Sequence, residues 1–192
     1  MDRFDIYLIG VGGQGIGLLS EIILRAADHA GLPVKGVDTH GLAQRGGIVR
    51  SQVRIGAGAN SPLIRQGTAD LVVALERHEA LRGMNSALRN AGTLLYYNTV
   101  WQPLAVRLNR AAVVSEEMIQ KECRRRGIRE IPVFRKGLTD ARLQNMVLLA
   151  HIDKLALIPE LETQHYHLAM TDLMAGAMLE KNQAIFNAER AS

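Results

Sequence analysis

One short segment, "LIGVGGQGIG" at residues 8–17, constrains the fold of this chain more than any other. It begins inside the apolar run "FDIYLIG", which predicts a buried strand. After the glycines, apolar residues such as Ile16, Leu19 and Ile22 recur at helical spacing, and "PVKGVDT" at residues 33–39 predicts a second strand. Strand, glycine turn, helix and strand in this order predict the βαβ unit of a parallel sheet.

The glycines of this segment allow three explanations. Gly10, Gly12 and Gly15 match the pattern G-x-G-x-x-G, in which a tight turn brings the N–H groups of a helix N-terminus close to an anion. Asp38, about 20 residues further on, lies where a dinucleotide-binding fold keeps the carboxylate that binds the ribose. A nicotinamide or flavin site, a site for another anion or for a partner's backbone, and close packing of helix on strand all stay open at this point.

A second polar segment, "THGLAQRGG" at residues 39–47, follows the predicted second strand. Arg45 is suited to clamp a carboxylate or a phosphate, because a guanidinium group offers two parallel donors. Gly46 and Gly47 would let the backbone come close to a ligand or a partner, and His40 is a candidate acid or base near neutral pH. The alternative is a loop that bonds to its own backbone, with Arg45 and His40 in structural roles.

The residues after this loop alternate in polarity, which predicts a half-exposed strand. One side of that strand would carry Val49, Val53 and Ile55, and the other side Arg50, Gln52 and Arg54. The cationic side would line a path for a phosphate, meet an acidic partner, or simply face solvent.

The remainder of the chain alternates strands and helices. Buried strands are predicted at residues 69–76, 92–99 and 131–134, and helices at residues 77–89 and in the charged segment that ends at Arg126. Apolar residues then recur at helical spacing over residues 139–157 and 161–186. The sequence therefore predicts one Rossmann-like α/β domain, with a mainly parallel sheet flanked by helices and a helical C-terminal portion.

Composition argues against several kinds of site. The single cysteine, Cys123, can form neither an internal disulfide nor a cluster held by four thiolates, and the histidines other than His40 show no metal-ligand spacing. The net charge is +4, but aromatic residues are 4% and the basic run at residues 124–129 is typical of a helix end, so we predict no nucleic-acid partner. No window approaches the roughly 20 apolar residues that span a bilayer, and the first residues lack a secretory apolar region, so we expect a cytoplasmic protein with no membrane partner.

The two glycine-containing motifs carry a resemblance to a known family. "GVGGQG" at residues 10–15, "HGLAQRGG" at 40–47 and "VRSQVRIG" at 49–56 occur in this order, followed by "SPLI", "ADLVVALE" and "ARLQNMVLLA". Together they resemble the gamma subunit, or gamma domain, of 2-oxoacid:ferredoxin oxidoreductases, and most of all the beta subunit of indolepyruvate oxidoreductases. Residues 1–192 would then form a single gamma-type domain, with Leu42 and Ile48 as modest departures from the family pattern.

The resemblance implies a subunit of an enzyme complex. Such complexes oxidatively decarboxylate a 2-oxoacid on thiamine diphosphate, transfer the acyl group to coenzyme A, and pass electrons through [4Fe–4S] clusters to ferredoxin. The resemblance places thiamine diphosphate and the clusters in larger partner subunits. This chain is therefore expected to hold no cofactor, no metal and no catalytic residue, and to be inactive in isolation. The expected substrate is indolepyruvate or another arylpyruvate.

The resemblance also implies which residues face a cofactor or the active site of the complex. They are Gly12, Gly13, Gln14, Gly15, His40, Gln44, Arg45, Gly46 and Gly47. We name residues 10–15 the glycine turn and residues 40–47 the arginine loop, and we expect the two to build one docking face for the partner. Two other functions stay open: a free-standing NAD- or FAD-binding oxidoreductase built on the turn and Asp38, and an interaction scaffold without a ligand.

Overall fold

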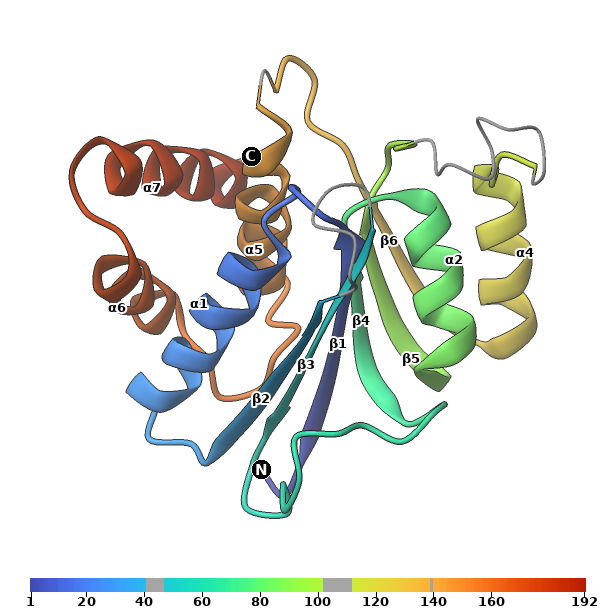
Figure 1. Ribbon diagram of the computed structural model, residues 1–192, viewed down its shortest axis with the longest axis horizontal. Helices are drawn as coiled ribbons and strands as arrows, with labels where there is room; N and C mark the ends of the chain where they lie inside the picture. Colours follow the sequence, from blue (N-terminus) through green and yellow to red (C-terminus); the bar gives the residue numbers. More distant parts are fainter. Residues whose placement is uncertain (41–46, 102–111, 139) are drawn as a thin grey trace.

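A six-stranded sheet forms the centre of the protein, and helices cover both of its faces (Figure 1). The computed structural model describes residues 1–40, 47–101, 112–138 and 140–192. The strands lie in the order β2-β3-β1-β4-β5-β6. Their bounds are Phe4–Val11 for β1, Val34–His40 for β2, Ile48–Ile55 for β3, Ala69–Ala74 for β4, Leu88–Tyr97 for β5 and Arg129–Val133 for β6.

The sheet is mainly parallel, as predicted, with one strand reversed. β4 pairs in parallel with β1 and with β5, and β5 pairs in parallel with β6. β3 is antiparallel to both of its neighbours, β1 and β2. The predicted strand–helix–strand unit is therefore present, but β3 is inserted between its two strands. A short connection allows this insertion, because β3 follows β2 after a few residues and such a connection joins only antiparallel strands.

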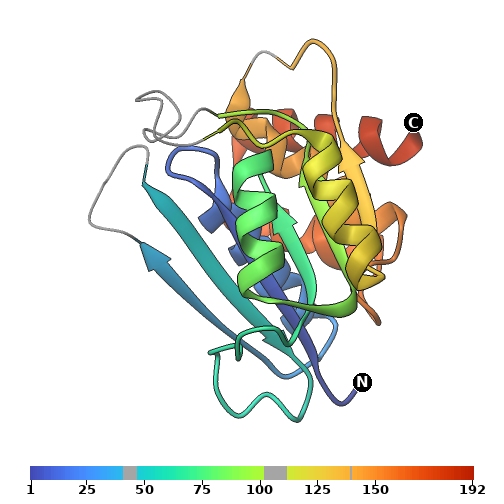
Figure 2. The ribbon, with the colours of Figure 1, turned by 90° about the vertical axis from the view of Figure 1, so that its right-hand side faces the viewer.

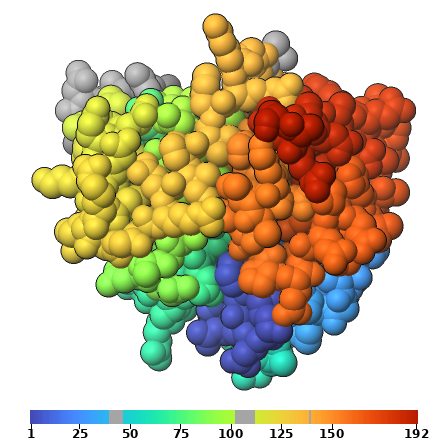
Figure 3. Space-filling view, turned by 180° about the vertical axis from the view of Figure 1, so that it is seen from behind, coloured from blue at the N-terminus to red at the C-terminus, as the bar shows by residue number. Residues whose placement is uncertain are grey.

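The helices form two layers. On one face lie α1 (Ile16–His29), α5 (Gln144–Lys154), α6 (Thr163–Leu173) and α7 (Gly176–Ala191), with the short 3₁₀ helix η1 (Ala141–Leu143) leading into α5. On the other face lie α2 (Arg77–Ser86) and α4 (Glu116–Arg126). Figure 2 shows α2 and α4 side by side over the sheet, and Figure 3 shows that much of the surface seen from behind comes from the second half of the chain.

Alternating side chains of the buried strands fill a core on each face. Leu8 and Val73 point into the layer of α1, α5 and α6, whereas Ile9 and Val72 point into the layer of α2 and α4. This alternation is the two-residue period of a strand, and burying both faces explains why β1 and β4 are almost continuously apolar.

Two helix ends differ in detail from the prediction. The basic run does end a helix, because Gly127 caps α4 in the left-handed conformation (φ 63°). Arg126, however, is not simply solvated: its Nε donates to Asn90 Oδ1 at 2.9 Å and its Nη1 to Met84 O at 2.7 Å. The second apolar pattern of the C-terminal portion contains two helices, because extended backbone at Met174 ends α6 before α7 begins.

Candidate functional site

The glycine turn joins β1 to α1 at the carboxyl edge of the sheet. β1 and β4 are neighbours, but α1 leaves β1 towards one face and α2 leaves β4 towards the other (Figure 1). In open α/β sheets this point, where successive connections go to opposite faces, is where ligands bind in the crevice beyond the strand ends. The fold thus places the glycine turn where a ligand site is expected.

The side chain of Gln14 closes that crevice. Gln14 is fully buried, its Oε1 accepts from Val11 N at 2.8 Å, and its Nε2 donates to Leu75 O at 3.1 Å. Nε2 also lies 3.4 Å from Gln144 Oε1 at the start of α5. Because Gln14 bridges the ends of β1 and β4, a dinucleotide crossing at this point would have to displace it. This geometry disfavours a nicotinamide or flavin site.

Two of the three motif glycines serve packing. A Cβ on Gly10 would come within 3.0 Å of Gln14 Oε1, and a Cβ on Gly15 would come within 2.5 Å of Asn145 Nδ2. Asn145 also donates from Nδ2 to Gly15 O at 3.2 Å, so α5 packs directly on the turn. Gly13 differs: it has a φ of +100°, and no described residue lies within 4 Å of its Cβ position. Within the turn, Gly13 therefore needs to be a glycine for its backbone conformation and not for packing.

One described end of the arginine loop meets the glycine turn. Gly12 N donates to Gly47 O at 2.9 Å, and the pairing of β1 with β3 sets Val11 opposite Ile48. His40 is the last residue of β2, and its backbone is paired with Val49. Gln44, Arg45 and Gly46, three of the predicted site residues, lie outside the described residues. The roles assigned to the loop remain predictions, but its Gly47 end is bonded to the turn and its His40 end is paired with β3.

The two arginines of β3 have different roles. Arg54 is fixed by hydrogen bonds within the chain. Its Nε donates to Asp5 Oδ1 at 2.9 Å, and its Nη1 donates to the carbonyl oxygens of Ser61 and Leu63. Asp5 is fully buried, so this ion pair is structural. Arg50 is exposed. The predicted cationic strand face therefore offers Arg50 but not Arg54 to a ligand or partner.

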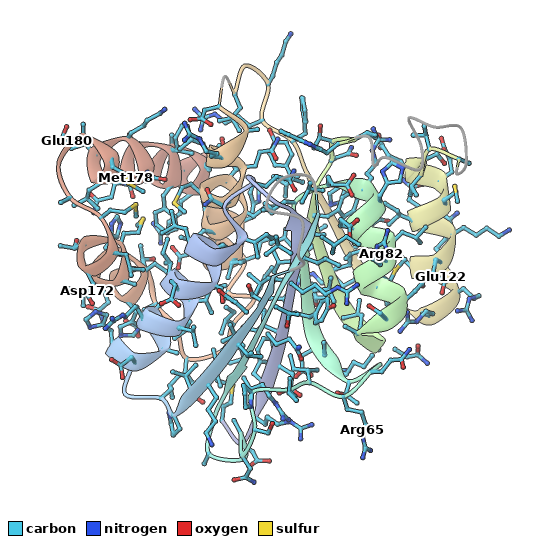
Figure 4. All side chains as sticks on the ribbon, in the orientation of Figure 1. Arg65, Arg82, Glu122, Asp172, Met178 and Glu180 are labelled. Carbon is cyan, nitrogen blue, oxygen red and sulfur yellow. The ribbon has the colours of Figure 1, made fainter. Side chains whose placement is uncertain are left out.

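A cavity of about 930 Å³ lies beside the glycine turn, on the α1 side of the sheet. We name it the turn cavity. Its walls come from the turn and the first residues of α1, from residues 140–145 and from the start of α7. Its lining includes Gly12, Gly13, Gly15, Leu18, Val49, Asp140, Arg142, Leu143, Asn145, Met178 and Lys181. Figure 4 shows Met178 on α7, on the opposite side of the sheet from Arg82 of α2.

The sequence interpretation missed the charged rim of this cavity. Arg142 pairs with Asp140 through Nε–Oδ1 at 3.1 Å and Nη2–Oδ2 at 3.0 Å, and Lys181 Nζ lies 3.6 Å from Asp140 Oδ2. Hydrogen bonds from Arg142 lower the pKa of Asp140 to about 2. The rim thus carries two cations and one carboxylate. These residues lie more than 120 positions from the turn in the sequence, and no local pattern links them to it.

A second group of ionisable residues lies under α2, on the other side of β1. Glu76 caps α2 by accepting from Glu79 N at 2.5 Å, and its Oε2 lies 3.1 Å from His78 Nδ1. His78 Nε2 accepts from Val114 N at 3.2 Å, so the proton of the ring is on Nδ1. Burial raises the pKa of Glu79 to about 7, and burial likewise raises the pKa of the Cys123 thiol to about 12. All four side chains are buried, which suits structural roles.

Two further properties of the described residues bear on function. Within the described ranges, no group of three or more His, Cys, Asp or Glu side chains is placed to hold a metal ion. Among the helices that the structure describes, none combines the length and the apolar character needed to cross a membrane.

Known proteins similar to this chain belong to one group of oxidoreductases. The chain matches the sequence model of pyruvate ferredoxin/flavodoxin oxidoreductases over residues 5–191. It is 50% identical over 97 residues to the indolepyruvate oxidoreductase subunit IorB of Archaeoglobus fulgidus. That match covers 50% of this chain and 47% of the relative, so the chain spans about half the length of that relative.

Two solved structures share the fold at 18% sequence identity. One is the gamma subunit of a keto/oxoacid ferredoxin oxidoreductase from Geobacter sulfurreducens, with a TM-score of 0.65 over 98% of this chain and 96% of that chain. The other is a 2-oxoglutarate:ferredoxin oxidoreductase from Magnetococcus marinus with 2-oxoglutarate, coenzyme A and succinyl-CoA bound. Its TM-score is 0.71, over 100% of this chain and 31% of that chain. The Rossmann-like prediction is thereby confirmed.

Proposed function

This chain belongs to the pyruvate ferredoxin/flavodoxin oxidoreductase family, and we propose that it is the small subunit of a 2-oxoacid:ferredoxin oxidoreductase complex. The observation that carries the proposal is the contact between Gly12 and Gly47, which holds the glycine turn and the arginine loop at one edge of the sheet. This contact supports a surface that the two sequence motifs would share. Such a surface suits a subunit that completes a site on a larger partner.

The proposed reaction is the oxidative decarboxylation of a 2-oxoacid. The 2-oxoacid anion and coenzyme A give acyl-CoA, CO₂, one proton and two electrons, and two oxidised ferredoxins accept the electrons one each. Thiamine diphosphate, when bound, supplies the carbanion that allows loss of CO₂. We assign the substrate as indolepyruvate or another arylpyruvate, which is supported by the name of the relative from Archaeoglobus fulgidus.

We assign thiamine diphosphate and the [4Fe–4S] clusters to the partner subunits. The residues of this chain do not fit a cluster, because its single cysteine is buried and a cluster needs four thiolates. Burial also raises the pKa of the Cys123 thiol to about 12, which disfavours the thiolate that metals require. This chain would instead shape the coenzyme A side of the active-site channel.

Within the complex, we assign Arg45 to a contact with the anionic end of a substrate. A guanidinium group can donate two parallel hydrogen bonds to a carboxylate or a phosphate, and the Gly12–Gly47 hydrogen bond anchors the loop that carries it. Gly46 would give the backbone the same close approach. The rest of the chain positions this loop and contributes no group to the chemical step.

The experiment is to express the chain with its large partner and to measure 2-oxoacid-dependent reduction of ferredoxin. Arg45→Ala is expected to lower kcat/KM at least tenfold while the complex still assembles, because a charge-assisted contact contributes roughly 1.5–3 kcal/mol. Arg65→Ala is the matched control, since Arg65 is exposed at the opposite edge of the sheet (Figure 4). A scaffold without a ligand predicts loss of assembly instead, and tight binding of NADH or FAD by the isolated chain would refute the subunit role.

A further inference from the structure

We propose that the turn cavity is a binding site for a small amphipathic acid, a molecule with an apolar body and one anionic group. The inference goes beyond the subunit role, and it can be tested on the isolated chain without any partner. Three observations carry it: the size of the cavity, the apolar character of its walls and the charge at its rim.

The size and the walls fit a small molecule with an apolar body. At about 930 Å³, the cavity lies in the range of about 300–1,000 Å³ typical of small-molecule sites. Its lining includes the apolar side chains of Val11, Ile16, Leu18, Val49, Leu143 and Met178. Met178 is 53% exposed although it is a large apolar side chain, so this wall lacks a covering group in the isolated chain. An apolar body in the cavity would cover it.

The rim selects an anionic group. Asp140 is the only acidic residue among the described residues that line the cavity, whereas both Arg142 and Lys181 line it. Asp140 compensates one of these two cations, which leaves one positive charge at the rim. Arg142 uses its Nε and Nη2 for Asp140, and Lys181 Nζ is 3.6 Å away from the same carboxylate. Arg142 Nη1 and the ammonium group therefore retain N–H donors for a carboxylate or phosphate oxygen.

The neighbouring crevice is not an alternative place for this ligand. Gln14 fills the space between the ends of β1 and β4, and Gln144 and Asn145 of α5 pack against Gln14 and Gly15. The open space lies on the other side of the turn, where no residue that the structure describes comes within 4 Å of the Cβ position of Gly13. A ligand bound at the turn would thus lie in the turn cavity and touch the backbone at Gly13.

The experiment uses the purified full chain and calorimetric titration with simple probes. 3-Phenylpropanoate tests a carboxylate head, and phenyl phosphate tests a phosphate head. As controls, 3-phenylpropanol lacks the anionic group, and acetate and inorganic phosphate lack the apolar body. We expect at least one of the two acids to bind at least tenfold more tightly than the alcohol and the bare anions. The tighter of the two identifies the head group.

Two variants locate the binding. Lys181→Gln removes a rim charge and is expected to weaken the preferred acid about tenfold, and Ala177→Phe is expected to abolish binding by filling the mouth of the cavity, which Ala177 lines. Lys121→Gln, an exposed lysine on α4, is the matched control and should bind like the unchanged chain. The proposal is overturned if neither acid binds, if the alcohol binds equally well, or if both cavity variants bind as the unchanged chain does.

Discussion

The two sides of β1 contain ionisable residues in opposite environments. On the α1 side, Arg142 and Lys181 at the turn cavity have side chains that are 77% and 57% exposed. On the α2 side, Glu76 and Glu79 are 0% and 1% exposed. Charges at an open cavity stay available to a ligand, whereas buried ones are committed to each other or to the neutral form. The difference separates the proposed binding surface from a buried network, although both adjoin one strand.

Burial on the α2 side should suppress the chemistry of Cys123. Its pKa is raised to about 12 from an ordinary value of 9.0, so the thiolate fraction near neutral pH falls about 1,000-fold. We expect Cys123 to react with a thiol reagent at least 100-fold more slowly in the folded chain than in urea. A stopped-flow absorbance assay with a disulfide reagent measures both rates. Folded and unfolded rates within a factor of ten would mean that the α2 side is open, and the comparison would fail.

Glu79 should make the stability of the chain depend on pH. Because burial raises its pKa from 4.5 to about 7, the folded state holds a proton that the unfolded state has lost between these values. The contribution of Glu79 to the free energy of unfolding is therefore largest below pH 4.5 and is lost as the pH rises to about 7. At 1.36 kcal/mol per pKa unit, the total loss is about 3 kcal/mol. In urea unfolding, the free energy of unfolding of Glu79→Gln should not decrease over this pH range.

Glu180→Gln is the control for that measurement, because Glu180 is an exposed residue on α7 (Figure 4). It should follow the unchanged chain at every pH. If Glu79→Gln and the unchanged chain lose stability in parallel between pH 5 and 7.5, Glu79 is ionised in the folded state and the α2 side is better solvated than its burial indicates.

Two of the four glycines of the turn, Gly13 and Gly15, test how tightly α5 packs on it. Gly15→Ala meets both a φ of +82° and the Asn145 amide, so we expect a loss of about 3 kcal/mol from backbone strain and overpacking. Gly13→Ala meets only the φ of +100°, and about 1 kcal/mol is expected. Urea unfolding of both variants gives the difference, about 2 kcal/mol. Equal losses would show that α5 does not pack tightly on the turn.

Much of the fold followed from local patterns in the sequence. The glycine turn after an apolar run predicted β1 and α1, and the alternation after Gly47 predicted β3 with Val53 and Ile55 buried. The pattern did not show that β3 lies between β1 and β2, because alternation reports which face is buried and not which strand is the neighbour. Likewise, Arg50 and Arg54 lie four residues apart on the same side of the alternating pattern, so the sequence made them look equivalent. Only the contact with Asp5 distinguished Arg54 from Arg50.

By itself, the sequence determined the mainly parallel α/β architecture and the glycine turn, and its motifs carried the resemblance to the family. These depend on spacing over a few residues, and backbone geometry translates such spacing directly into strands, turns and helices. Only the tertiary structure decided that Gln14 fills the crevice and that Asp140, Arg142 and Lys181 surround a cavity next to Gly13. Contacts between residues 120 or more positions apart depend on how α5 and α7 pack against α1, and that packing leaves no periodic trace in the sequence.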